Sequence, residues 1–217
     1  MTTKNLSLKH LIKPSNLTDK KAPTIILLHG YGSDENDLFS FAPELDDKYL
    51  IVSAKAPMQM MPYGNAWYEI NFDANQNKFT NDAQAVKSRE LIVNFIDEVI
   101  ESYNADPNNI CLLGFSQGSI LSYAVALSYP EKVQRVVALS GYIHEEIIKS
   151  DYKTKDFSNL KIYASHGSQD PVIPVAWARN IQGFLDNLKI ENTYSEFPAG
   201  HGVTPENFKE FKAWLES

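Results

Sequence analysis

The amino-acid sequence predicts an α/β fold in which a mostly parallel central sheet is covered by helices on both faces. Short apolar runs alternate along the chain with segments of helical spacing, as in strands joined by crossover helices. The apolar runs are continuous, which indicates strands that are buried on both faces. Because no repeat, low-complexity tract or linker divides the 217 residues, we expect a single domain over 1–217.

Six runs rich in apolar and β-branched residues are the expected strands. They lie at 24–28, 49–53, 110–113, 135–139, 161–164 and 193–197. Their length of four or five residues suits buried strands better than helices. Residues 6–13 are a candidate for an additional antiparallel strand at the edge of the sheet.

The expected helices lie between and after these runs. In the segment 92–103, apolar residues recur at helical spacing and form one stripe, and the segment 177–188 repeats this pattern. The last helix is expected to begin after Thr204, because Thr at the N-cap followed by Pro at the first helical position is a start signal.

Composition and charge exclude several classes of protein. The formal charge of −7 opposes binding to nucleic acid, which requires clustered Lys and Arg. Residues 1–10 lack the hydrophobic region of a signal peptide, and no apolar run reaches the ~18 residues of a membrane span. We therefore expect a cytoplasmic protein. Cys111 is the only cysteine, and no motif with metal-ligand spacing is present, so no metal site is expected.

One sequence motif indicates a catalytic function. It is Gly114-Phe115-Ser116-Gln117-Gly118, which matches G-x-S-x-G. An expected strand precedes it and an expected helix, 119–129, follows it. That order is typical of a nucleophile elbow, a sharp turn that projects the serine hydroxyl above the sheet. Ser116 is therefore the candidate nucleophile.

A serine nucleophile needs a base, and the base needs an acceptor that orients it. In such folds the acid and the histidine follow the serine in the sequence, in loops at the carboxyl ends of later strands. Asp170 follows the strand at 161–164, and His201 follows the strand at 193–197, so they are the candidate acid and base. The other histidines, His10, His29, His144 and His166, are in weaker positions.

Attack on a carbonyl creates an oxyanion, which requires donors placed in advance. We expect one donor to be the backbone N–H of Gln117, at the start of a helix. The second is expected from the glycine-containing loop after the first central strand, and we assign it to the N–H of Tyr31.

Six segments in this order resemble the phospholipase/carboxylesterase family, which includes acyl-protein thioesterases and small bacterial esterases. They are His29-Gly-Tyr-Gly32, Ala66-Trp-Tyr-Glu-Ile70, Gly114-Phe-Ser-Gln-Gly118, Leu139-Ser-Gly-Tyr142, His166-Gly-Ser-Gln-Asp-Pro171 and Gly200-His-Gly202. The resemblance implies an α/β-hydrolase fold, the same nucleophile, acid, base and oxyanion donors, and no cofactor. This chain departs from the family at Tyr31, where Leu is frequent, and at Glu69, where Asp is frequent.

Apolar and aromatic residues after the strand at 49–53 are candidates for a substrate-binding wall. The candidate substrate-binding residues are Met60, Trp67, Tyr68, Phe72 and, after the acid, Val172. The alternative is that they cover the core under a long loop. The hydrophobic loop 58–62 is also a candidate contact in a homodimer. Because no long insertion separates 139 from 161, we expect a minimal lid or none.

These observations predict a serine carboxylesterase that hydrolyses small to medium ester molecules through an acyl-enzyme, with thioesters and lysophospholipids as further candidate substrates. A peptidase or a dienelactone-hydrolase-like enzyme is the alternative within enzymes. A non-catalytic binding protein of the same fold is the alternative from another class, because fold does not determine function.

Overall fold

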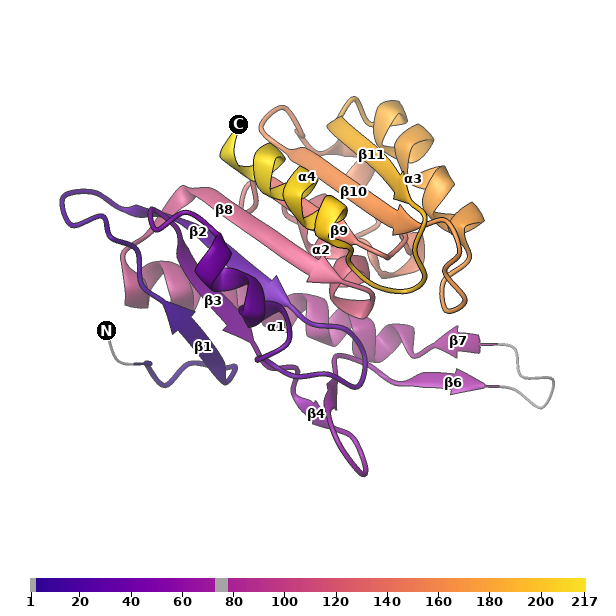
Figure 1. Cartoon of the computed structure of the whole chain (residues 1–217), viewed down its shortest axis with the longest axis horizontal. Coiled ribbons are helices and arrows are strands. Elements are labelled where there is room, and N and C mark those ends of the chain that lie inside the picture. The colour runs from indigo at the N-terminus through magenta and orange to yellow at the C-terminus, as the bar shows by residue number, and fades with distance from the viewer. Residues whose placement is uncertain (1–2, 73–77) are drawn as a thin grey trace.

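The computed structural model describes residues 3–72 and 78–217, and its centre is a seven-stranded sheet (Figure 1). The strand order is β1 (His10–Lys13), β3 (Leu50–Ala54), β2 (Ala22–Leu28), β8 (Ala105–Phe115), β9 (Arg135–Leu139), β10 (Lys161–Gly167) and β11 (Glu191–Phe197). Among the described strands of this sheet, only β1 pairs in the antiparallel direction, with β3. The predicted mostly parallel sheet and its antiparallel edge strand are confirmed, although the edge strand begins at His10 rather than at residue 6.

Four helices cover the two faces of this sheet. They are α1 (Asp82–Tyr103), α2 (Gln117–Ser128), α3 (Val175–Asn187) and α4 (Pro205–Glu216). Alternate side chains of each strand point to opposite faces, which creates two separate clusters of buried apolar residues. The larger cluster joins the sheet to α1, α2 and α3, and the smaller one joins it to α4 and to a 3-10 helix at Leu38–Glu44.

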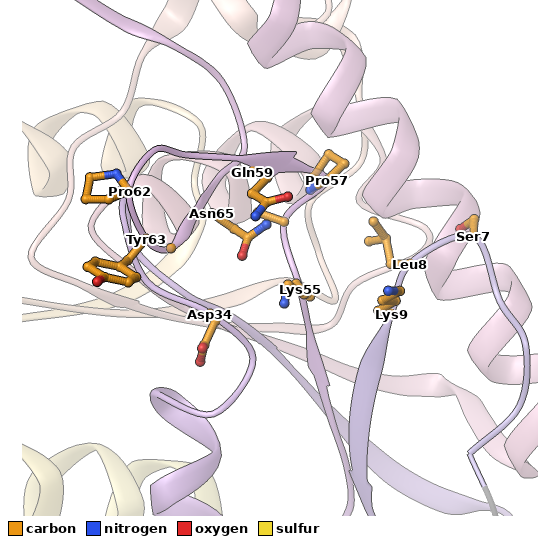
Figure 2. Close-up of a pocket in the computed structure, with 12 residues that line it drawn as sticks. Ser7, Leu8, Lys9, Asp34, Lys55, Pro57, Gln59, Pro62, Tyr63 and Asn65 are labelled. Carbon is orange, nitrogen blue, oxygen red and sulfur yellow. The ribbon is translucent and has the colours of Figure 1, made fainter.

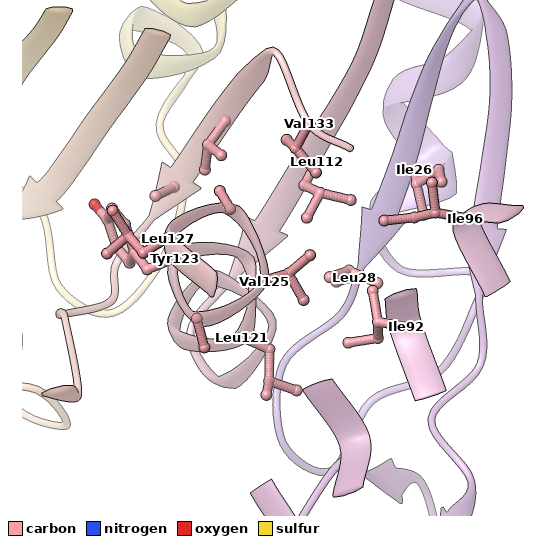
Figure 3. Close-up of a cluster of buried hydrophobic side chains, with 14 of the residues drawn as sticks. Ile26, Leu28, Ile92, Ile96, Leu112, Leu121, Tyr123, Val125, Leu127 and Val133 are labelled. Atoms are coloured by element: carbon pink, nitrogen blue, oxygen red, sulfur yellow. The ribbon is translucent and has the colours of Figure 1, made fainter. Parts of the chain in front are cut away.

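Figure 3 shows the larger cluster between the sheet and its helices. Ile26 and Leu28 of β2 lie opposite Ile92 and Ile96 of α1, and the solvent reaches none of these four side chains. The helix α2 is buried along its whole length between the sheet and its neighbours. Most of its side chains are apolar or small, as is typical of a helix in the interior.

The helix ends follow local signals in the sequence. Thr204 caps α4 by accepting a hydrogen bond from the N–H of Asn207 at 3.2 Å, and Pro205 is the first helical residue, as predicted. Asn81 caps α1 by accepting from the N–H of Gln84 at 3.2 Å. α1 thus begins ten residues before the apolar stripe that predicted it, because a polar cap rather than an apolar residue marks its start.

Two short hairpins lie outside the sheet. One joins β4 (Met58–Gln59) to β5 (Asn65–Ala66), and the other joins β6 (Ile70–Phe72) to β7 (Lys78–Thr80). Both follow β3 in the chain and therefore start from the edge of the sheet where the parallel strands end. Among the helices of the described residues, none is long and apolar enough to cross a membrane.

We predict that Ile96→Ala will lower the free energy of unfolding by about 2–5 kcal/mol, because it leaves a cavity in the larger cluster. Glu101→Ala, on an exposed position of the same helix, is the matched control and should change it by less than about 0.5 kcal/mol. Urea unfolding followed by circular dichroism measures both values. Equal effects of the two substitutions would contradict the packing of α1 against the sheet.

Candidate active site

Ser116 lies in a strained turn between β8 and α2. Its φ of 52° and ψ of −114° fall outside the regions that a non-glycine residue ordinarily adopts. A Cβ atom at Gly114 would overlap the carbonyl of Gly118, and one at Gly118 would overlap the carbonyl of Leu28 in β2. Both glycines are therefore required for the close packing of β8, α2 and β2. This packing holds the turn in a conformation that costs about 1–3 kcal/mol.

The structure brings Ser116, His201 and Asp170 together, although they are far apart in the sequence. The Nε2 atom of His201 lies 2.9 Å from the Oγ of Ser116, and its Nδ1 lies 2.7 Å from the Oδ2 of Asp170. Asp170 and His201 stand in the loops that follow β10 and β11, at the edge of the sheet where β8 ends. The imidazole thus bridges hydroxyl and carboxylate, as a base in a nucleophilic triad must.

The carboxyl group of Asp170 is held by several donors. Its Oδ1 accepts the backbone N–H groups of Val172 at 2.8 Å and Ile173 at 2.9 Å. Burial alone would raise the pKa of Asp170, but the hydrogen bonds from His201 and from these two N–H groups outweigh it and lower the pKa. Asp170 is therefore ionised at neutral pH and favours the tautomer of His201 that carries its proton on Nδ1.

His166 is a further neighbour of the acid, which the sequence analysis set aside. Its Nε2 lies 2.9 Å from the carbonyl oxygen of Ile173 and 3.3 Å from the Oδ2 of Asp170, and no part of its side chain is exposed. A carbonyl only accepts hydrogen bonds, so Nε2 carries a proton that also faces the carboxylate. His166 therefore fixes the loop that carries the acid. The sequence signal for it is its position four residues before Asp170 at the end of a strand.

The backbone of the loop after β2 passes directly beside the serine. A Cβ atom built on Gly30 would lie only 3.4 Å from the Cβ of Ser116. The Nδ1 of His29 lies 2.7 Å from the carbonyl oxygen of Gly30 and donates to it. Because the peptide group is planar and trans, the N–H of Tyr31 points away from the His29 ring.

Two backbone N–H groups next to the serine are free to bind an anion. Within residues 3–72 and 78–217, neither the N–H of Tyr31 nor that of Gln117 donates to a protein atom. Gln117 is the first residue of α2, where the helix dipole favours negative charge. The arrangement suits the oxyanion hole that the sequence analysis assigned to these two groups. The side chain of Tyr31 is 41% exposed, so it is directed to solvent.

His29 itself is buried and held in one protonation state. Its Nε2 accepts the N–H of Ala56 at 3.0 Å while its Nδ1 donates to Gly30, so the ring is neutral in the native state. Burial lowers the pKa of His29, although the hydrogen bond to Gly30 and, to a smaller extent, the nearby carboxylates raise it in part. The orientation of the loop after β2 thus depends on a neutral imidazole.

The side chain of Gln117 is fully engaged in binding the segment 67–68. Its Oε1 accepts the N–H of Trp67 at 2.8 Å, and its Nε2 donates to the carbonyl oxygen of Tyr68 at 2.7 Å. The residue is only 2% exposed. Both polar atoms of the side chain are thus directed to the segment 67–68, while the backbone N–H donates to no described protein atom.

The structure buries Trp67 and Tyr68, two of the residues expected in a substrate wall. Their exposed fractions are 0% and 1%, although Trp67 also lines a cavity of about 330 Å³ together with Pro57 and Met58. The indole N–H of Trp67 donates to the carbonyl oxygen of His29 at 3.0 Å. The burial of this pair favours the alternative, that these residues cover the core, and the indole N–H of Trp67 finds its partner there.

The other three substrate-binding candidates differ in position. Met60 lies in the turn of the β4–β5 hairpin, where its N–H donates to the carbonyl of Gly64 at 2.9 Å. Val172 is 48% exposed and follows the acid in the chain, so it stays a candidate for substrate contact. Phe72 ends β6, but its side chain lies outside the described part of the structure.

Potential metal ligands and thiols do not gather at this site. Within the described residues, no group of three or more His, Cys, Asp or Glu side chains is arranged to hold a metal ion. Cys111 lies inside β8, and burial raises the pKa of its thiol to about 12. The side chains that face Ser116 are thus those of acid–base chemistry.

Comparisons with known proteins identify the family of this chain. The family model described as Phospholipase/Carboxylesterase matches residues 14–217. The chain belongs to the phospholipase/carboxylesterase family. The resemblance stated from the sequence is confirmed, and with it a hydrolase of the carboxylesterase and acyl-protein thioesterase type.

Individual relatives extend over most of the chain. Acyl-protein thioesterase 1 of Mycosarcoma maydis is 25% identical over 222 residues, which cover 91% of each chain. The crystal structure of esterase PE8 has a TM-score of 0.84 at 24% identity and covers 97% of this chain and 99% of that one. The Bacillus cereus carboxylesterase has a TM-score of 0.84 at 20% identity, with 98% and 95% covered. At these identities the two structures show a shared fold, the predicted α/β-hydrolase fold.

Because His29 is neutral in the folded state, we predict that the protein becomes less stable as the pH falls. Below its ordinary pKa of 6.5 the unfolded chain binds a proton that the folded chain resists, so stability is lost as the pH falls. Lowering the pH from about 7.5 to about 5.5 should cost about 1 kcal/mol through this residue. Urea unfolding of the wild type and of His29→Gln at both pH values measures the difference. A variant that loses as much stability as the wild type would argue against this role.

A second prediction concerns the Gln117 side chain. Gln117→Ala leaves two buried backbone groups of segment 67–68 without partners, so the free energy of unfolding should fall by about 2 kcal/mol or more. Ester hydrolysis by the folded variant should stay within about tenfold of the wild type, because the backbone N–H is retained. Gln182→Ala, at an exposed position of α3, is the control for both assays. A loss of activity as large as that of Ser116→Ala would refute the backbone assignment.

Proposed function

We propose that this protein is a serine carboxylesterase that hydrolyses small to medium carboxylic esters through an acyl-enzyme. The observation that carries the proposal is the continuous chain of contacts from the Ser116 hydroxyl through His201 to Asp170, at 2.9 Å and 2.7 Å. These distances are within the range in which a base activates a serine hydroxyl.

The first half of the reaction forms the acyl-enzyme. The Oγ of Ser116 attacks the carbonyl carbon of the ester while the Nε2 of His201 takes the hydroxyl proton. The N–H groups of Tyr31 and Gln117 bind the oxyanion of the tetrahedral intermediate. When the intermediate collapses, the bond to the alcohol breaks and the imidazolium gives its proton to the leaving oxygen.

The second half of the reaction releases the carboxylic acid product. A water molecule gives a proton to His201 and attacks the acyl carbon, and the same N–H groups bind the second oxyanion. Collapse breaks the bond to Oγ, and the proton returns to Ser116. Asp170 stays ionised throughout and stabilises the imidazolium in both halves.

The preference for small to medium esters rests on the open surroundings of the site. The chain between β9 and β10 forms only two single-turn 3-10 helices, Glu145–Ile147 and Tyr152–Thr154, in place of an inserted lid domain. Val172 is half-exposed next to the acid, and Trp177 at the start of α3 is 46% exposed. Apolar groups that water already reaches suit the acyl or alcohol part of a dissolved ester.

Thioester hydrolysis is the second candidate function. It is favoured by the similarity of this chain to proteins that are named as thioesterases. Several relatives, including the protein of Mycosarcoma maydis, are acyl-protein thioesterases. The same triad would release a thiol in place of an alcohol, so thioesters belong among the substrates to be tested.

We expect the wild type to hydrolyse p-nitrophenyl esters, with kcat/KM highest for short acyl chains in a series from acetate to palmitate. Ser116→Ala should lower kcat by at least about 10³-fold, because the nucleophile is lost while the oxyanion donors remain. Release of p-nitrophenol measures both effects. A rate maximum at palmitate would refute the preference for small esters.

A fluorophosphonate probe provides the control that separates an enzyme from a binding protein of the same fold. The probe should label the wild type, because it reacts with an activated serine, and should leave Ser116→Ala unlabelled. Ser140→Ala is the matched control, since Ser140 also follows a strand and has a positive φ of 52°. Absence of labelling in the wild type would contradict the proposed function.

A further inference from the structure

The loop that carries His201 is not closely packed on both sides of this residue. His201 stands between two glycines, and a Cβ atom added at Gly202 would meet no atom beyond its chain neighbours within 4 Å. The side chain of His201 is 16% exposed. Its Nε2 and Nδ1 atoms face Ser116 and Asp170, at 2.9 Å and 2.7 Å. The orientation of the imidazole therefore depends on the groups that touch the ring itself.

An aromatic ring lies beside this imidazole. The ring centroids of Phe115 and His201 are 4.9 Å apart and the ring planes are inclined by 49°, which is within the range of attractive aromatic pairs. Within residues 3–72 and 78–217, no other aromatic ring pairs with that of His201. Phe115 is the last residue of β8, and a Cβ atom at Gly30 would lie 3.1 Å from its Cδ1. The Phe115 ring thus fills the space between the loop after β2 and the base.

One of the two hydrogen bonds of His201 is lost during half of the proposed reaction. Once the Oγ of Ser116 carries the acyl group, it has no proton to donate to Nε2. Asp170 then holds only the Nδ1 side of the ring, and a single hydrogen bond leaves the ring free to turn. Nε2 must still direct a water molecule at the acyl carbon, and a misplacement of about 1 Å can cost about 10²-fold in rate. The base therefore needs a contact that does not involve Ser116.

We propose that Phe115 is a positioning residue for the base, whose ring holds the imidazole of His201 in place while Ser116 is acylated and favours its positively charged form. This role presupposes the esterase reaction of the proposed function. The Phe115 ring is itself packed against the smaller apolar cluster and the loop after β2. It makes no hydrogen bond that the reaction breaks, so its contact with the imidazole survives acylation.

The same contact stabilises positive charge on His201. A cation within about 6 Å of an aromatic ring is attracted by the ring electrons, and the separation here is 4.9 Å. Among the described residues, the carboxylate of Asp170 is the charged group bonded to the imidazole, and His166 approaches that carboxylate at 3.3 Å. The Phe115 ring adds an uncharged support to the imidazolium. Its removal should therefore lower the pH at which the base gains its proton.

Stopped-flow measurement of p-nitrophenyl acetate hydrolysis tests the role in positioning. In Phe115→Leu the rate constant of deacylation should fall about tenfold, because the imidazole is less well placed once Ser116 is acylated. The ratio kcat/KM depends only on the steps up to acylation and should stay within about threefold of the wild type. The variant should therefore show a lower kcat together with a lower KM, and a burst of p-nitrophenol before the steady state.

The pH dependence tests the role in stabilising charge. The midpoint of the pH profile of kcat/KM should lie about half a pH unit lower in Phe115→Leu than in the wild type. Nuclear magnetic resonance of the His201 ring measures the same midpoint without turnover. Phe115→Met fills more of the volume but has no aromatic ring, so it should show the same lower midpoint. It replaces Phe115→Leu if that variant does not fold.

Two variants are controls for the loss of an aromatic ring. Phe41→Leu removes a ring from the same smaller cluster, where its centroid lies 5.1 Å from that of Phe208 and 5.8 Å from that of Phe211. Tyr63→Leu removes an 84% exposed ring from the β4–β5 hairpin, at the cavity of about 560 Å³ shown in Figure 2. Both variants should keep the wild-type kinetics and midpoint, even where Phe41→Leu lowers the stability.

Three results would overturn this role of Phe115. One is a Phe115→Leu variant whose deacylation is unchanged, or whose kcat/KM falls as far as its kcat. Another is an unchanged midpoint of the His201 ring in both Phe115 variants. The third is an equal effect of Phe41→Leu on kinetics and midpoint. A wild type that neither hydrolyses the ester nor reacts with the fluorophosphonate probe contradicts the proposed function instead, and the resonance titration then still tests the contact.

Discussion

The arrangement of the site depends on the close packing of β2, β8 and α2 at a single turn. Gly118 touches the carbonyl of Leu28, and this contact brings the end of β2 against the start of α2. The contact holds Ser116 in a positive-φ conformation that it would not adopt in a free peptide. It also places the loop after β2 next to the serine. One steric constraint therefore sets the distance between the candidate nucleophile and both candidate oxyanion donors.

A buried polar network makes this arrangement rigid. The segment 67–68 lies between the two donor loops: Trp67 donates to the carbonyl of His29, and Gln117 binds the backbone of both residues. The indole N–H of Trp67 and the side-chain oxygen and nitrogen of Gln117 all have partners in this network, and paired buried groups favour one geometry. The loop after β2 and the start of α2 are thus connected through a third segment as well as by direct contact. This connection explains why two aromatic residues near an active site are buried rather than open to substrate.

The sequence predicted most of the fold because the strands of this sheet are buried on both faces and their apolar runs are continuous. It predicted the meeting of Ser116, Asp170 and His201 because each follows a strand whose end lies at one edge of a parallel sheet. The first turns of α1 were missed for a physical reason: Arg89 is buried there, with its guanidinium bound to Glu90 and to the carbonyl of Ile147. A buried arginine interrupts the apolar stripe, and its distant partner is invisible in the local sequence.

The same limit explains why the roles of Trp67 and His166 were not found. An aromatic residue in a loop is equally compatible with a substrate wall and with a core, and the choice depends on whether its N–H reaches a partner elsewhere in the chain. For Trp67 that partner is the carbonyl of His29, 38 residues away.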